Sequence, residues 1–232
     1  MKIIRWFLSP NKVLEYSFFW LQIFSFSFVF SFFFSFFSLY LFNFFDFKQG
    51  FFAQIMFVHV PAAWIALFLY VLLSFFSFIF LIYKHPLVIY FNDVLSFSCI
   101  VFVVITLITG SLWGKPTWGV WWVWDARLTS VFVLFLFLIS IIILRKSFDK
   151  DTYGAEAASF LTLLGLINVP IIRFSVEWWN TLHQPSSITL FSSSVHSLVL
   201  FFLFCVFVCF FLFCISIILM YVRTIILKLK SF

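Results

Sequence analysis

Uncharged stretches of 16 to 45 residues alternate along the chain with short segments that carry the charges. A membrane-spanning helix requires about 20 consecutive apolar residues, whereas a lone strand in lipid leaves its backbone polar groups without partners. We therefore interpret even the alternating Phe and Ser residues at 24–28 as helical. The pattern predicts an all-α integral membrane protein with six transmembrane helices, at roughly 17–42, 56–83, 93–113, 128–145, 156–173 and 194–220.

The fifth of these stretches is the weakest. Only 16 uncharged residues separate Glu156 from Arg173, and they include Gly165, Asn168 and Pro170. Because proline interrupts helical hydrogen bonding, we expect this helix to be short or kinked near its end.

The cations indicate how the six helices are oriented, because loops on the inner side of a membrane are enriched in Lys and Arg. Sorting all 14 between the two sides gives ten against four. We therefore predict that both termini lie on the inner side, facing the matrix or cytoplasm. The inner set is Lys2, Arg5, Lys12, Lys84, Arg145, Lys146, Lys150, Arg223, Lys228 and Lys230, and the outer set is Lys48, Lys115, Arg127 and Arg173.

Composition excludes a soluble globular protein. Of the 232 residues, 65% are hydrophobic and only 9% are charged, against about 25% charged in globular proteins. Six spans use the whole chain, so we expect a single domain over residues 1–232. The net charge of +6 is spread without a basic run, which argues against nucleic acid as a partner. The four cysteines lie in apolar stretches without a CxxC motif, and we assign them no chemistry.

Tryptophan is concentrated in two of the predicted outer segments, roughly 113–127 and 173–193. An interfacial aromatic belt is one interpretation, but a belt should be present on both sides of the membrane. The clustering on one side favours a platform for a large flat ligand. Seven of the ten tryptophans lie there: Trp113, Trp118, Trp121, Trp122, Trp124, Trp178 and Trp179.

Two histidines, His59 and His183, fall on the same predicted side as the tryptophans. Each alone fits a plain hydrogen-bonding role, but two imidazoles flanking an aromatic platform are what a haem iron requires as axial ligands. Zinc fits less well, because no carboxylate is spaced from them in a ligand pattern. His196 is a possible spare ligand that we rank below His183, and we expect His85 to be structural.

Asp125 and Arg127 are the charges at the end of the tryptophan-rich segment. They could form an ion pair that caps the fourth helix, since an acidic residue is favoured at a helix N-terminus. Alternatively, Arg127 and Lys115 could bind haem propionates through charge-assisted hydrogen bonds. The sequence leaves these two interpretations equal.

Three blocks carry a family resemblance. The segment WGKPTWGVWWVWDARLTS at 113–130 resembles the WWD signature of haem-handling proteins, most closely that of the cytochrome c maturation protein C (CcmC) family. HVPAA at 59–63 and VPIIRFSVEWWNTLHQ at 169–184 are similar to the two histidine blocks of that family. The resemblance implies that haem b is held transiently at the WWD segment, with His59 and His183 as axial iron ligands, and is delivered to the haem chaperone CcmE. It also implies CcmA, CcmB and CcmD as partners.

The resemblance implies a carrier of haem and no enzyme. No P-loop motif occurs in the chain, so any ATP-driven step must belong to a partner. A b-type electron carrier is the main alternative, although it usually needs two histidine pairs across the bilayer. A small-molecule permease without a cofactor is a third candidate function. Composition favours the mitochondrial inner membrane over a bacterial one.

Overall fold

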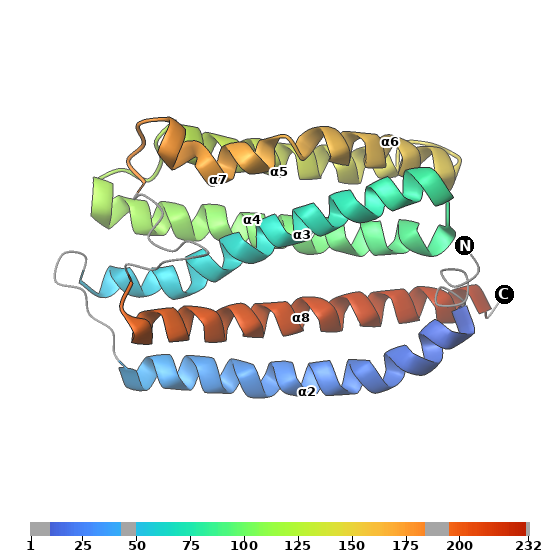
Figure 1. Ribbon diagram of the computed structural model, residues 1–232, viewed down its shortest axis with the longest axis horizontal. Coiled ribbons are helices and arrows are strands. Elements are labelled where there is room, and N and C mark those ends of the chain that lie inside the picture. The colour runs from blue at the N-terminus through green and yellow to red at the C-terminus, as the bar shows by residue number, and fades with distance from the viewer. Residues whose placement is uncertain (1–9, 43–49, 184–194, 231–232) are drawn as a thin grey trace.

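The computed structural model describes residues 10–42, 50–183 and 195–230, and long helices dominate it (Figure 1). Six helical segments are long and apolar enough to cross a membrane, which confirms the predicted fold class. They are α2 (Pro10–Phe42), α3 (Met56–Tyr83) with the short 3-10 helix η1 (Phe51–Ile55) before it, α4 (Pro86–Trp118), α5 (Ala126–Arg145), α6 (Asp151–Gly165) with α7 (Asn168–Trp178), and α8 (Ser197–Lys230).

Several helices extend beyond the predicted spans, and α4 matters most for the site. Pro86 occupies its first turn, where a missing backbone N–H is harmless, and Gly119 ends it in the left-handed conformation at φ 78°. The predicted span stopped at residue 113, just before Gly114 and Pro116, residue types that usually break helices. In the structure both lie inside α4. Trp113 and Trp118 therefore lie on the last turns of a helix, and not in a loop.

The fifth span is interrupted, as its composition predicted. Residues 166 and 167 separate α6 from α7, and the amides of Ile167 and Val169 donate to carbonyls three residues back. Pro170 explains the position of the break, because its ring would clash with the carbonyl of Leu166 in a continuous α-helix. The buried Asn168 ties the break to α5 by donating from Nδ2 to the Ser130 carbonyl oxygen at 2.8 Å.

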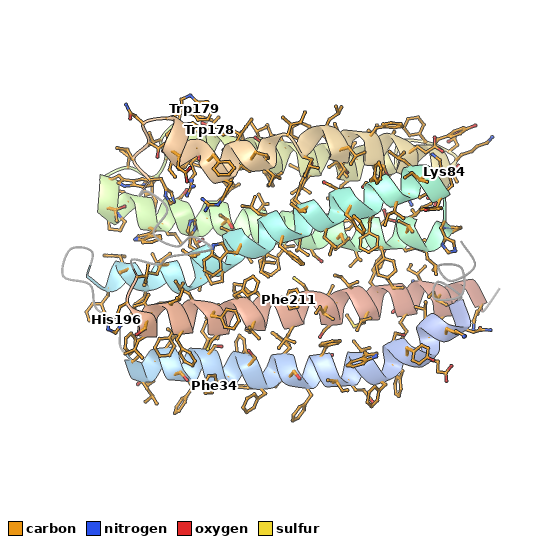
Figure 2. All side chains as sticks on the ribbon, viewed as in Figure 1. Phe34, Lys84, Trp178, Trp179, His196 and Phe211 are labelled. Atoms are coloured by element: carbon orange, nitrogen blue, oxygen red, sulfur yellow. The ribbon has the colours of Figure 1, made fainter. Side chains whose placement is uncertain are left out.

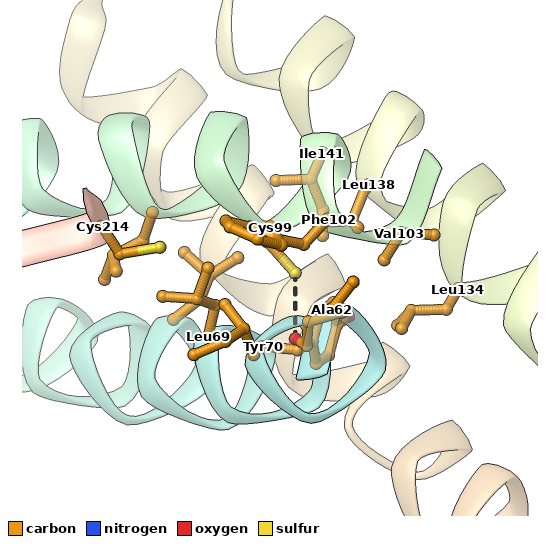
Figure 3. Packing of buried hydrophobic residues seen from close by; sticks show 14 of the residues in the cluster. Ala62, Leu69, Tyr70, Cys99, Phe102, Val103, Leu134, Leu138, Ile141 and Cys214 are labelled. Atoms are coloured by element: carbon orange, nitrogen blue, oxygen red, sulfur yellow. Dashed lines mark hydrogen bonds between the residues drawn. The ribbon is translucent and has the colours of Figure 1, made fainter. Parts of the chain in front are cut away.

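One large apolar core joins α3 to its neighbours (Figure 3). Tyr70 and Leu69 of α3 lie in it with Phe102 of α4 and Leu138 of α5. Cys99 belongs to the same cluster and donates from Sγ to the Ala66 carbonyl oxygen at 3.3 Å. Beside this core, α2 packs along α8, as the two lowest helices in Figure 1 show.

The two ends of the bundle differ in their side chains. α2 begins and α8 ends at one end, where Lys84 also lies, whereas Trp178, Trp179 and His196 lie at the other (Figure 2). Lys84 forms a salt bridge with Glu156 at 2.7 Å at the end where α2 begins and α8 ends. The compartment that each end faces stays a prediction. Lys2, Arg5, Lys48 and residues 184–194, which enter the predicted topology, lie outside the described residues.

Candidate functional site

His59 lies near the start of α3, directly against the last third of α4. Its Nδ1 atom is 3.0 Å from the hydroxyl of Thr109, and the Trp113 ring meets its imidazole edge to face at a centroid distance of 5.8 Å. The ring also packs on Gly110, where an added Cβ would lie 3.0 Å from His59 Cε1. Three residues on one face of α4 thus fix the position of this imidazole.

His183 follows the end of α7 and approaches the same helix, α4. The ring of Trp118 meets it at a centroid distance of 6.4 Å, one turn beyond Trp113. Because Trp113 and Trp118 lie five positions apart on α4, His59 and His183 contact neighbouring turns of that helix. The structure therefore brings the two histidines together from segments more than a hundred residues apart, each beside its own tryptophan of α4.

Arg127, the second residue of α5, connects His183 to α7. Its Nη1 atom lies 3.4 Å from His183 Nδ1, while Nε donates to Ser175 Oγ at 3.2 Å and Nη2 to the Arg173 carbonyl oxygen at 3.3 Å. The guanidinium therefore holds α5, α7 and His183 in one arrangement.

Asp125 is the N-cap of α5, and its Oδ1 accepts from the Leu128 amide at 2.8 Å. The capping half of the predicted role is confirmed, but the structure shows no salt bridge from Asp125 to Arg127. Asp125 Oδ2 and the indole nitrogen Trp122 Nε1 are both buried, and neither has a hydrogen-bonding partner among the described residues. Buried polar atoms without partners are uncommon in proteins, so these two are available to a ligand.

The remaining tryptophans surround this centre in separate groups. Trp122 and Trp124 pack edge to face on each other and on Phe132 of α5. Trp178 stacks on Phe174 and meets Trp179 edge to face. Trp121 lies under the Lys115 ammonium at 5.9 Å, while that ammonium donates to the Gly119 carbonyl oxygen at 2.9 Å. Trp121, Trp124, Trp178 and Trp179 are 50 to 72% exposed, so large aromatic surfaces face outward here.

The other two histidines cap helices. His196 is exposed before α8 and accepts from the Leu198 amide at 3.3 Å, and His85 does the same for Leu87 at the start of α4. Sequence reasoning missed Thr109 and Gly110. Both lie in the predicted span 93–113, about one helical turn before Trp113, so helical spacing alone would have placed them on the same face as that ring.

The fold and the site define a multi-pass membrane protein that gathers two histidines, an arginine and exposed tryptophans at one end of its helical bundle. Its similarity to mitochondrial and bacterial proteins places it in an inner membrane. The chain belongs to the CcmC family, described as Heme exporter protein C, whose model matches residues 3–231. This confirms the resemblance seen in the sequence motifs.

Individual relatives agree with this family. A ccmC-like mitochondrial protein of cytochrome c biosynthesis from Marchantia polymorpha is 46% identical over 162 residues, which cover 70% of this chain and 68% of the relative. Its Arabidopsis thaliana counterpart is 46% identical over 65% of this chain and 57% of the relative. Heme exporter protein C of Escherichia coli is 44% identical over 61% and 58%, respectively. The matched segments thus span between a little over half and about two thirds of these relatives.

Proposed function

We propose that this chain binds haem b transiently at the end of the bundle that carries the tryptophans, with His59 and His183 as axial ligands, and delivers it to the chaperone CcmE. Family membership supports the coarser statement that the chain handles haem in cytochrome c biogenesis. We further propose that CcmA, CcmB and CcmD are its partners and that the haem site faces the outer compartment.

The observation that carries the proposal is the convergence of His59 and His183 beside Trp113 and Trp118 on one helix. A haem needs two axial nitrogens and flat apolar walls, and these four side chains supply both chemical types in one place. Lone interfacial tryptophans would not require a histidine beside each of them.

The residues around the histidines also fit the polar parts of a haem. Arg127 and Lys115 are cations that can bind propionates through charge-assisted hydrogen bonds. Trp122 Nε1 is a buried donor without a partner among the described residues, and it can donate to a carboxylate. Asp125 Oδ2 can accept from a chaperone or from an ordered water.

Exposure favours transfer of haem over permanent retention. Trp121 and Trp124 are 55% and 72% exposed at the end of the bundle, so a haem against them stays accessible to a second protein. A b-type electron carrier instead holds its haem deep between helices. This contrast supports delivery to a chaperone over the electron-carrier alternative.

The test is the absorption spectrum of the purified protein with haem, recorded before and after addition of CcmE. We expect a six-coordinate low-spin spectrum that His59→Ala and His183→Ala each abolish, while the matched control His85→Ala leaves it unchanged. Haem should then appear on CcmE. A low-spin spectrum that survives His183→Ala but not His196→Ala would overturn the ligand assignment, and haem that never leaves for CcmE would favour the electron carrier.

A further inference from the structure

The ring nitrogens of the two proposed ligands face different hydrogen-bonding groups. A neutral imidazole carries one proton, and only its unprotonated nitrogen can bind a metal. The group that contacts Nδ1 therefore determines which nitrogen of each histidine is available to iron.

At His59 the contacting group is an acceptor. The hydroxyl of Thr109 donates its single hydrogen to the Ile105 carbonyl oxygen at 2.6 Å, and the Thr106 carbonyl oxygen is a second acceptor at 3.4 Å. Toward His59 Nδ1, 3.0 Å away, this hydroxyl can only accept. Nδ1 therefore carries the proton, and Nε2 is left unprotonated for iron.

At His183 the contacting group is a donor. Arg127 has five N–H donors and no acceptor, so its Nη1 atom donates to His183 Nδ1 across 3.4 Å. Nδ1 is thus the unprotonated nitrogen, and it is covered by the guanidinium. In the neutral ring the proton then lies on Nε2, which cannot bind iron until it is lost.

We infer that His59 and His183 are held in opposite tautomers, so that His59 ligates haem first while Arg127 keeps His183 from binding until a haem carboxylate draws the guanidinium away. This deepens the proposed function and rests on it. A carboxylate accepts a stronger hydrogen bond from Arg127 than a neutral imidazole does. Once Nδ1 is released, it gains a proton from water and Nε2 gives one up, with no net change in protonation. Thr109 and Arg127 are positioning residues in this scheme.

The first test measures the tautomers without haem. The chain contains only four histidines, so ring-15N-labelled protein in lipid nanodiscs gives an assignable spectrum once each histidine is replaced in turn. We expect protonated Nδ1 in His59 and protonated Nε2 in His183. The same tautomer at both positions in the native protein would overturn the inference.

Matched variants assign each tautomer to its cause. Thr109→Val removes the acceptor and should give His59 a mixture of tautomers, whereas Thr109→Ser should keep the native state. Arg127→Gln should change the tautomer of His183 and leave that of His59 unchanged. The control Arg173→Gln changes a neighbouring side chain but keeps the backbone carbonyl that Arg127 uses, and His183 should not respond. A His183 tautomer that is unchanged in Arg127→Gln would overturn the role of this arginine.

The second test compares haem with its dimethyl ester, which lacks carboxylates. In the native protein we expect haem to give the six-coordinate spectrum and the ester to bind through His59, with the second ligation slowed about tenfold or more. In Arg127→Gln the two compounds should ligate His183 at equal rates. Equal rates already in the native protein would refute control by the haem carboxylates.

The two proposals fail in distinguishable ways. If the tautomers are as expected but no haem binds, the proposed function is wrong and the hydrogen-bonding assignment stands. If haem binds through both histidines but their tautomers are alike in the haem-free protein, the proposed function stands and the ordered ligation is wrong.

Discussion

The imidazole of His59 lies on the backbone of Gly110, so close that an added Cβ would be 3.0 Å from its Cε1 atom. This distance is shorter than an ordinary van der Waals contact, so a methyl group at position 110 must displace the ring. Gly110→Ala should therefore tilt His59 away from Thr109 and Trp113. We expect haem affinity to fall about tenfold or more, since an axial ligand must hold its orientation. Titration with haem measures this loss.

Ser111 supplies the matched control, because it follows Gly110 directly on α4. Ser111→Ala removes a hydroxyl next to the critical glycine without adding volume against His59. We expect haem affinity near the native value. If Gly110→Ala binds haem as tightly as Ser111→Ala, the close packing of His59 has no bearing on ligation.

Asp125 offers a way to separate helix capping from haem handling. Asp125→Ala should lower stability by about 0.5–2 kcal/mol, because Oδ1 no longer accepts from the Leu128 amide. Asp125→Asn preserves a good N-cap but removes the charge. We expect Asp125→Asn to accumulate normally and yet to load less CcmE, measured as haem-bound chaperone. If Asp125→Asn loads CcmE with haem as well as the native protein does, Asp125 serves only as a helix cap.

Topology is tested by cysteine labelling in sealed membranes. Trp121 precedes α5, Lys146 follows it, and both are exposed. Cysteines that replace them lie at opposite ends of that helix, so an impermeant maleimide should reach Trp121→Cys and Lys146→Cys from opposite sides. The excess of cations near the termini predicts that residue 121 reacts from the outer compartment. If residue 121 is labelled only from the matrix or cytoplasm, the proposed haem site faces the inner compartment and the predicted topology is wrong.

The six spans could be predicted from the sequence alone, because the length of an apolar stretch determines whether a helix can cross lipid. It was insufficient for the helix ends and for the contacts of Arg127. Gly114 and Pro116 indicate a loop, yet α4 continues to Trp118, as proline is tolerated more readily in membrane helices than in soluble ones. The bond from Arg127 to His183 joins residues 56 positions apart, which no local pattern reveals.

Arg145 should be the cation whose loss destabilises the fold most clearly. It donates to Asp93 at 2.8 Å and to Asp151 at 2.7 Å, and the side chains of Arg145 and Asp93 are only 15% and 17% exposed. Arg145→Met leaves Asp93 largely buried without its partner, at a cost of about 3–5 kcal/mol. Arg173→Met, which breaks an exposed pair at 3.9 Å from Glu177, should cost about 1 kcal/mol or less. Thermal denaturation in detergent ranks the two variants.

Tyr70 of α3 packs against the C-terminal end of α6, next to the break in the fifth span. The Tyr70 hydroxyl donates to the Thr162 carbonyl oxygen at 3.2 Å and occupies the space beside Gly165, where an added Cβ would clash with it. Gly165→Ala should therefore destabilise the protein by about 1–3 kcal/mol through overpacking. Tyr70→Phe removes the clashing oxygen, so the double variant should be more stable than Gly165→Ala alone. A double variant whose two losses simply add would show that the hydroxyl and Gly165 are not coupled.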